Sequence, residues 1–299
     1  MPYIKKDRLH RFLMADDTIR GAVINGSQMV RKMRRGHELG ILETLVLGHA
    51  YMGASLMSAG LKGQDRLCLQ VDCSGPIKGL QVEANAAGEV RGYLKNTPIP
   101  IDMPLECFDL SPFFGAGFLS VTRTIAGAKR PFTGKVMMAH GSLAKDLAHY
   151  YFTSEQIPTA FSLSVKFEND GRVAGAGGLF LQAMPGADDE MMKAVEGHVV
   201  TLPSIGTVLS EGEAPEALVS KYFSEYAPRF IDRRPVGFAC HCTRDQIRNL
   251  LTMLPIDELT DIQKDGPFPV NVRCHHCNTQ YAFEKVHLDR IVAARFAAN

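Results

Sequence analysis

The sequence predicts an α+β fold in three parts: an N-terminal mixed sheet-and-helix domain (1–184), a helical linker (185–239) and a small C-terminal four-cysteine zinc-binding domain (240–299). Three observations support this prediction. The first part contains many short β-rich runs and few helices, without the strand–helix alternation of a parallel sheet. The second contains short helical patterns that proline and glycine interrupt, and the third contains two close pairs of cysteines.

Apolar residues at helical spacing predict one long helix over residues 41–61. The residues that recur on this pattern are Leu47, Ala50, Ala54, Met57 and Leu61. The same stretch contains Glu43, His49 and Ser58, so it is too polar to span a membrane. We therefore expect a buried helix inside a globular domain.

Runs rich in β-branched and aromatic residues predict the strands of the first domain. The expected strands cover residues 67–71, 80–84, 90–94, 118–124, 132–138, 161–167 and 178–184. Gly75-Pro76 is the expected turn between the first two strands. Ser142 is expected to cap a helix in which Leu143, Leu147 and Tyr151 share one face.

The stretch 185–239 differs in character from the domain before it. It opens with Pro185-Gly186, and its first helical pattern carries Met191, Val195, Val199 and Leu202. A second short helix is expected over 214–226, before Pro228 and Pro235. Helices this short are marginal in isolation, so the linker is expected to fold only by docking onto a neighbour.

The C-terminal part reads as a small metal module. Thr243 is expected to cap a helix over 244–251, Pro255 ends it, and a second short helix covers 256–264. Strands at 270–273 and 280–283 are expected to flank the last cysteine pair as a hairpin. A region of this size buries little core, so metal binding is expected to supply on the order of 10 kcal/mol of its folding free energy.

Four cysteines carry the chemistry of this module. They form the motifs Cys240-His241-Cys242 and Cys274-His275-His276-Cys277. Four thiolates suit one tetrahedral Zn²⁺ per chain, and such a closed site leaves no open position for metal catalysis. The alternatives are a pair of structural disulfides or four unrelated thiols. Cys68, Cys73 and Cys107 lie outside these motifs; we interpret Cys68 and Cys73 as core cysteines and assign no role to Cys107.

Composition limits the classes of function. The formal net charge is +1 and charged residues make up 22%, which does not predict general attraction to nucleic acid or acidic membranes. No P-loop, dinucleotide-binding glycine pattern or GxSxG elbow is present. The odd number of scattered cysteines and the absence of a visible apolar signal segment favour a reducing, cytoplasmic location.

At the cysteines and upstream, the chain closely resembles the heat shock protein 33 family, the redox-regulated chaperones of the bacterial cytosol. The family hallmark is a CxC motif, about thirty residues and then a CxxC motif, as at Cys240, Cys242, Cys274 and Cys277. The resemblance covers nearly the whole chain. Other similar segments are Asp7–Arg11, Arg20-Gly21, Gly75-Pro76, Arg91-Gly92, Tyr151–Thr159 and Ala174–Pro185.

The resemblance implies a mechanism of regulation. It implies no catalytic residue, so the protein is expected not to be an enzyme. The reduced form would hold zinc and be inactive. Oxidation would form the disulfides Cys240–Cys242 and Cys274–Cys277, release zinc and unfold the linker. The exposed apolar surface would then hold unfolding client proteins without ATP, and the activated form would be a homodimer.

The residues supply physical reasons beside this resemblance. Zinc keeps sulfur as thiolate, the form that reacts with oxidants. A CxC disulfide closes a very small ring and is expected to be strained and easily reduced, which suits a reversible switch. Unfolding of the linker would expose its apolar side chains. These are Met191, Val195, Val199, Leu218, Val219 and Phe223.

Two other functions are compatible with a four-cysteine zinc site. A zinc ribbon that binds nucleic acid would use the nearby arginines, although the balanced overall charge argues against it. These arginines are Arg233, Arg234, Arg244, Arg248 and Arg273. An enzyme with a purely structural zinc would place its active site in the first domain, where no recognisable nucleophile or base is evident.

Overall fold

A computed structural model describes residues 6–101 and 109–297. The chain forms two compact units, Met1–Ala239 and Cys240–Asn299. The stretch 185–239 therefore folds together with the residues before it, and the first zinc-ligand candidate opens the second unit. The predicted α+β class is confirmed, since both units combine helices with antiparallel strands.

The first unit contains a five-stranded antiparallel sheet in the order β10-β1-β2-β9-β8. Its strands are β1 (Arg8–Met14), β2 (Ile19–Asn25), β8 (Thr159–Phe167), β9 (Val173–Ala183) and β10 (Arg229–Pro235). Alternate residues of these strands point to opposite faces. Leu9 and Ile24 belong to the main core on one face, whereas Phe12 and Val23 belong to a second core on the other.

A six-stranded sheet in the order β11-β5-β4-β3-β6-β7 forms the other layer of this unit. Its strands are β3 (Arg66–Cys73), β4 (Gly79–Asn85), β5 (Glu89–Leu94), β6 (Gly117–Thr124), β7 (Phe132–Met137) and β11 (Gly237–Phe238). Only β11 pairs in parallel, with β5; the other pairs are antiparallel. One side chain in two along β3, β4 and β5 is buried, as expected for a sheet with one covered face.

Helix α2 (Ile41–Met57) packs against strands of both sheets and forms the centre of the main core. It is buried on nearly every side, which explains why its sequence is apolar all round. The other described helical segments before residue 185 are α1 (Ser27–His37), η1 (Ser58–Gly60), α3 (Ser111–Phe114), α4 (Leu143–Tyr150) and the π-helical turn η2 (Tyr151–Glu155).

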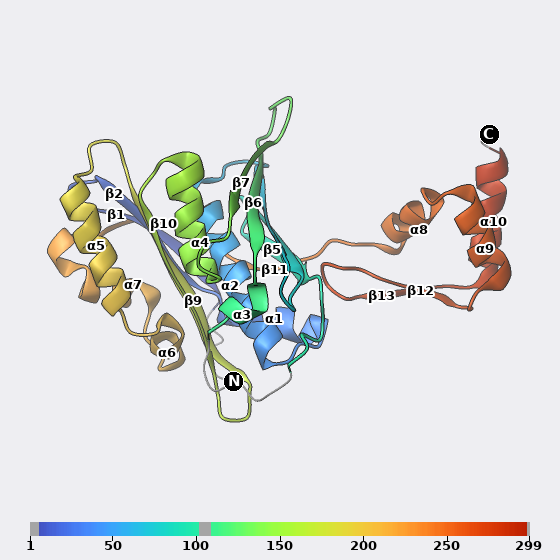
Figure 1. Ribbon diagram of the computed structural model, residues 1–299, viewed down its shortest axis with the longest axis horizontal. Helices are drawn as coiled ribbons and strands as arrows, with labels where there is room; N and C mark the ends of the chain where they lie inside the picture. The colour runs from blue at the N-terminus through green and yellow to red at the C-terminus, as the bar shows by residue number, and fades with distance from the viewer. Residues whose placement is uncertain (1–5, 102–108, 298–299) are drawn as a thin grey trace. The chain divides into compact units, whose positions relative to one another are not determined.

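Three helices cover the face of the five-stranded sheet that points away from α2 (Figure 1). They are α5 (Asp189–Thr201), α6 (Ile205–Ser210) and α7 (Pro215–Tyr222), followed by the 3₁₀ turn η3 (Ser224–Tyr226). Their apolar side chains and those of the sheet form what we call the outer core. It consists of Phe12, Met14, Ile19, Val23, Ala160, Leu179, Leu181, Met192, Val195, Ile205, Val208, Leu209, Leu218, Val219, Phe223 and Tyr226.

The second unit contains α8 (Arg244–Thr252), α9 (Ile256–Asp265), the hairpin β12 (Val270–Arg273) and β13 (Gln280–Phe283), and α10 (Lys285–Ala297). Thr243 caps α8 as predicted, in a capping box with Gln246. The core of this unit is small. It consists of Ile247, Leu251, Leu259, Phe283, Leu288, Ile291 and Val292.

The structure corrects several details of the sequence prediction. The strands β1 and β2 and the helix α10 were not predicted, and the residues of β10 and β11 were expected to belong to a helical linker. Ser142 occupies the N-cap position of α4, but its side chain makes no capping bond. The buried Asp146 carboxylate instead accepts hydrogen bonds from the N–H groups of Ala139, His140 and Ser142.

Candidate metal centre

The four predicted cysteines converge at one point of the second unit. Cys240 and Cys242 lie just before α8, and Cys274 and Cys277 lie in the turn between β12 and β13. All four Sγ atoms lie within 4.8 Å of one another. The Cys240 and Cys274 sulfurs are 3.8 Å apart, and those of Cys242 and Cys277 are 3.4 Å apart. Both of these contacts join one motif to the other.

Local hydrogen bonds shape the turn that carries the second motif. The Asn278 N–H donates to the Cys274 carbonyl oxygen at 2.7 Å, and the Cys274 N–H donates to the Thr279 carbonyl oxygen at 3.0 Å. Asn278 adopts the left-handed backbone region with φ of 59°, which asparagine tolerates better than most residues. The tight turn directs both sulfurs of the CxxC motif to the same side.

This donor set fits a tetrahedral zinc ion. Zinc–sulfur bonds of about 2.3 Å place tetrahedral sulfurs about 3.8 Å apart, close to the two distances above. Burial raises the pKa of the Cys274 thiol to about 12. Burial acts in the same direction on Cys277, but hydrogen bonds with Thr279 and the neighbouring thiols lower the pKa of Cys277 to about 7. Four adjacent thiolates need a cation to neutralise them, which a bound metal provides.

Two hydroxyl groups each lie close to one of the sulfurs. The Tyr281 hydroxyl on β13 lies 3.1 Å from Cys242 Sγ and donates to the Cys242 carbonyl oxygen at 2.9 Å. The Thr279 hydroxyl lies 3.2 Å from Cys277 Sγ. Neither residue was predicted from the sequence. The available signal was weak: hydroxyl side chains that follow the last cysteine by two and four positions.

A model of the Hsp33 protein family matches residues 7–284, which include all four cysteines and most of both compact units. The chain belongs to the Hsp33 family. Its predicted resemblance to that family is therefore confirmed, and so is its class as a chaperone-family protein.

Individual relatives agree with this assignment. The 33 kDa chaperonin of Desulforamulus reducens is 36% identical over 289 residues, covering 96% of this chain and 97% of the relative. The 33 kDa chaperonin of Syntrophotalea carbinolica is 34% identical over 291 residues, covering 96% of this chain and 100% of the relative. The crystal structure of the 33 kDa chaperonin of Thermotoga maritima, a heat shock protein 33 homolog, matches with a TM-score of 0.88 and 30% identity. That match covers 98% of this chain and 100% of the other.

The other cysteines are separate from this Hsp33 centre. Cys68 and Cys73 lie on β3 in the first unit and are half-buried, not fully buried as expected of core residues. Burial raises the pKa of Cys68 to about 11 and also raises that of Cys73, so both stay protonated at neutral pH and react slowly with oxidants. Cys107 lies outside the described residues. In the part of the chain that the structure describes, no helix is long and apolar enough to cross a membrane.

Proposed function

We propose that this Hsp33-family protein is a cytosolic, redox-regulated holdase that binds unfolding proteins without ATP during oxidative stress. In the reduced state Cys240, Cys242, Cys274 and Cys277 hold one Zn²⁺ and the protein is inactive. The convergence of their four sulfurs within 4.8 Å is the observation that supports this proposal most directly. The chaperonin names of the relatives favour it over an enzyme or a nucleic-acid-binding zinc ribbon.

The bound ion supplies neutralising charge and a cross-link between the segment before α8 and the hairpin β12–β13. Oxidation by two equivalents of a two-electron oxidant such as peroxide would convert the four thiolates to two disulfides. Their sulfurs would then carry no negative charge and bind zinc poorly. The second unit then depends on its small core, which we expect to be insufficient. Loss of the ion therefore becomes loss of fold in residues 240–299.

Residues 185–239 act as the metastable linker in this proposal, and residues 1–184 act as the client-binding and dimerisation domain. In the folded state Val195 on α5, Leu218 and Val219 on α7, and Phe223 at the end of α7 are buried in the outer core. Met191 and Val199, which we expected to join them, pack only partly buried against it. Release of these helices exposes both the linker and the sheet face beneath them to clients.

The proposed disulfides are Cys240–Cys242 and Cys274–Cys277. Because all four sulfurs lie close together, several pairings are within reach of small movements. The pairing within each motif is the one that the resemblance to the family implies. Peptide mapping of the oxidised protein by mass spectrometry tests this choice. A disulfide between residues of different motifs would contradict it.

The decisive experiment treats the reduced, zinc-loaded protein with peroxide at a mildly raised temperature. Zinc release, thiol content and suppression of the aggregation of citrate synthase are measured in the same sample. We expect one metal and four thiols to be lost as aggregation is suppressed. A Cys68→Ser, Cys73→Ser variant is the matched control and should respond like the wild type. Zinc release without any suppression of aggregation would overturn the proposal.

A further inference from the structure

The strand β10 is attached to the first unit mainly through its main chain. It pairs antiparallel with β1 from Arg8↔Pro235 to Leu13↔Arg229, with a register shift that leaves Ile231 without a partner residue on β1. Within the described residues, β10 forms the edge of its sheet. Val236 N–H donates to the Asp7 carbonyl oxygen, and Ala15 N–H donates to the Tyr226 carbonyl oxygen. Because bonding pairs alternate in an antiparallel ladder, the N–H groups of Asp232 and Arg234 point toward β1.

The two paired strands differ sharply in how firmly they are held. Side chains of β1 belong to both cores, and Leu9 and Phe12 are 0% exposed. Every residue of β10 is exposed except Phe230 and Arg234, which are half-buried. If β10 leaves, β1 therefore stays in place and presents a row of unpaired N–H and C=O groups.

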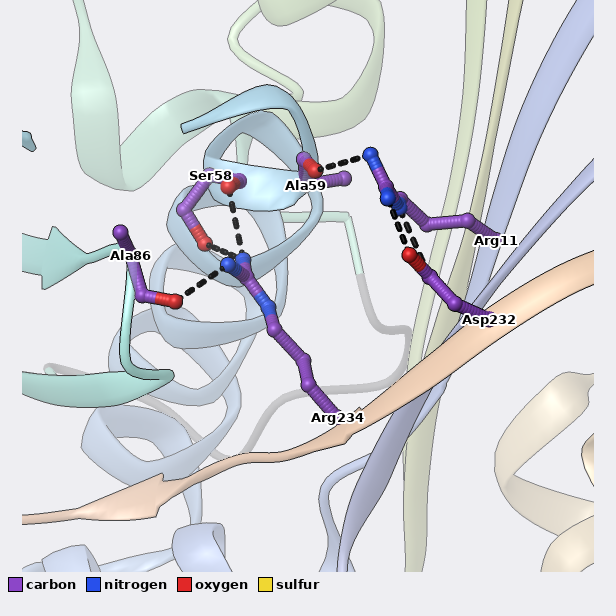
Figure 2. A network of polar contacts seen from close by, with 6 residues as sticks. All are labelled: Arg11, Ser58, Ala59, Ala86, Asp232 and Arg234. Atoms are coloured by element: carbon purple, nitrogen blue, oxygen red, sulfur yellow. Dashed lines mark hydrogen bonds and ion pairs between the residues drawn. The ribbon is translucent and has the colours of Figure 1, made fainter. Parts of the chain in front are cut away.

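Side-chain anchors hold β10 at a few points (Figure 2). The Arg234 guanidinium donates to the Ser58 carbonyl and hydroxyl oxygens and to the Ala86 carbonyl oxygen, each at 2.7 Å. The Asp232 carboxylate pairs with Arg11, whose guanidinium also donates to the Ala59 carbonyl oxygen. The acceptors of Arg234 are all neutral, and its buried Nε atom has no hydrogen-bond partner. The Arg234 contacts fix the position of β10 through specific geometry. The partly buried positive charge of Arg234, however, has no carboxylate among its hydrogen-bond acceptors.

The segment after β10 leads directly to the proposed switch. β11 pairs with β5, and the Ala239 N–H donates to the Val90 carbonyl oxygen at 3.0 Å. The next residue is Cys240. The backbone pairing of residues 229–239 therefore ends one residue before the first thiolate. Disorder of the second unit would leave the C-terminal end of this segment free to fray.

We infer that β10 occupies the site at which an extended segment of an unfolding client adds to the edge of β1. This inference rests on the proposed function and names the recognition mode at its client-binding domain. Main-chain hydrogen bonds are common to every polypeptide, so strand addition accepts clients of many sequences. β10 itself shows the fit, since it fills the edge with the same atoms that a client would offer.

The side chains of β10 indicate which client segments fit best. Phe230 packs against Phe12 in a tilted arrangement, with the ring centroids 5.5 Å apart. On the opposite face Ile231 lines a cavity of about 360 Å³, together with Leu13, Met57, Leu61 and Met184. Asp232 follows and pairs with Arg11. The preferred client segment is therefore extended, with two successive apolar residues followed by an acidic one.

A pair of peptides with the sequence of residues 227–237 tests main-chain recognition. One carries N-methyl groups at Asp232 and Arg234, whose N–H groups face β1. The control carries them at Phe230 and Arg233, which lie opposite Phe12 and His10. Because the register shifts at Ile231, the N–H groups of both residues face away from β1. Binding of each labelled peptide to the oxidised full-length protein is measured by fluorescence anisotropy. We expect the inward-methylated peptide to bind more weakly than the control, on the order of tenfold or more. Equal binding of the two peptides would overturn the inference.

A second arm does not depend on the redox switch. In the reduced, zinc-loaded state, the variant Asp232→Ala/Arg234→Ala should bind the unmodified peptide more tightly than the wild type, because β10 keeps its Arg229–Asp17 ion pair but has lost the contacts of Asp232 and Arg234. Unchanged binding would contradict the inference even if the proposed function holds. Conversely, if the oxidised protein fails to suppress the aggregation of citrate synthase, the proposed function is contradicted, regardless of the peptide-binding results.

Discussion

The Tyr281 hydroxyl group reaches across the metal centre to Cys242, 2.9 Å from its carbonyl oxygen and 3.1 Å from its sulfur. Tyr281 lies on β13, whereas Cys242 belongs to the segment that leads into α8. The contact therefore joins the same two parts of the second unit that the four thiolates join. A group that orients a metal ligand in this way contributes to metal affinity without touching the metal.

We predict that Tyr281→Phe weakens zinc binding on the order of tenfold, the range typical for loss of a hydrogen-bond partner of a metal ligand. Loss of the hydroxyl should also speed zinc release by peroxide, because Cys242 is held less firmly. Competition with a chromophoric chelator measures the affinity. Tyr93→Phe makes the same chemical change on β5 in the first unit and should leave zinc affinity unchanged. Equal affinities in the two variants would exclude a role for Tyr281.

Removal of the metal should unfold the second unit while the main core of the first unit stays folded. The core of the second unit has seven buried apolar residues, whereas zinc supplies on the order of 10 kcal/mol in comparable modules. We expect a zinc chelator under reducing conditions to abolish hydrogen-exchange protection in α8, α9 and α10. Protection in α2 and β3 serves as the internal control and should persist. Protection of α8–α10 that survives complete zinc removal would show that the module folds without its ion.

Most of the second unit could be predicted from sequence because its signals are local; the helix α10 was the element missed. The expected strands 270–273 and 280–283 match β12 and β13 at both ends, and Thr243 caps α8 as expected. The four sulfurs follow from the spacing of two short motifs. The contact between Tyr281 and Cys242 could not be predicted in the same way, since it depends on how the hairpin meets a distant segment.

The first unit shows where local signals fail. β10 contains Asp232, Arg233 and Arg234 between Pro228 and Pro235, a composition that resembles a loop. Its extended state depends on β1, a partner more than two hundred positions earlier in the chain. Long-range pairing overrides local propensity at such edge strands. By contrast, α2 was predicted because its apolar pattern alone requires a buried helix.

Loosening of the linker should activate the chaperone without oxidation. Val195 on α5 is 0% exposed in the outer core, and Val195→Ala should cost about 1–3 kcal/mol of docking stability. We expect the reduced, zinc-loaded variant to suppress citrate synthase aggregation at lower temperature than the wild type. Val200→Ala alters the same residue type in the same helix, at a side chain that is 85% exposed. Its activity should match the wild type, and equal activity of all three proteins would contradict this view of the linker.

The buried Asp7 carboxylate predicts a pH dependence for the stability of the first unit. It accepts hydrogen bonds from the N–H groups of Gln28 and Met29 at the start of α1, and it is 5% exposed. Burial raises the pKa of Asp7 to about 6, although the two hydrogen bonds oppose this shift. Between pH 4 and 6 the folded protein therefore retains a proton that the unfolded chain has lost.

The contribution of Asp7 to stability is consequently greatest below pH 4 and is lost as the pH rises through 6. Asp7→Asn removes the titration but keeps one oxygen acceptor. We expect the free energy of unfolding of the wild type, relative to this variant, to fall by on the order of 1 kcal/mol between pH 5 and 7.5. This free energy is measured by urea titration, with hydrogen exchange of β2 and α1 as the probe of unfolding. The variant Asp16→Asn, at an exposed position, controls for the lost charge. A difference that grows with pH would mean that the folded state favours the ionised carboxylate.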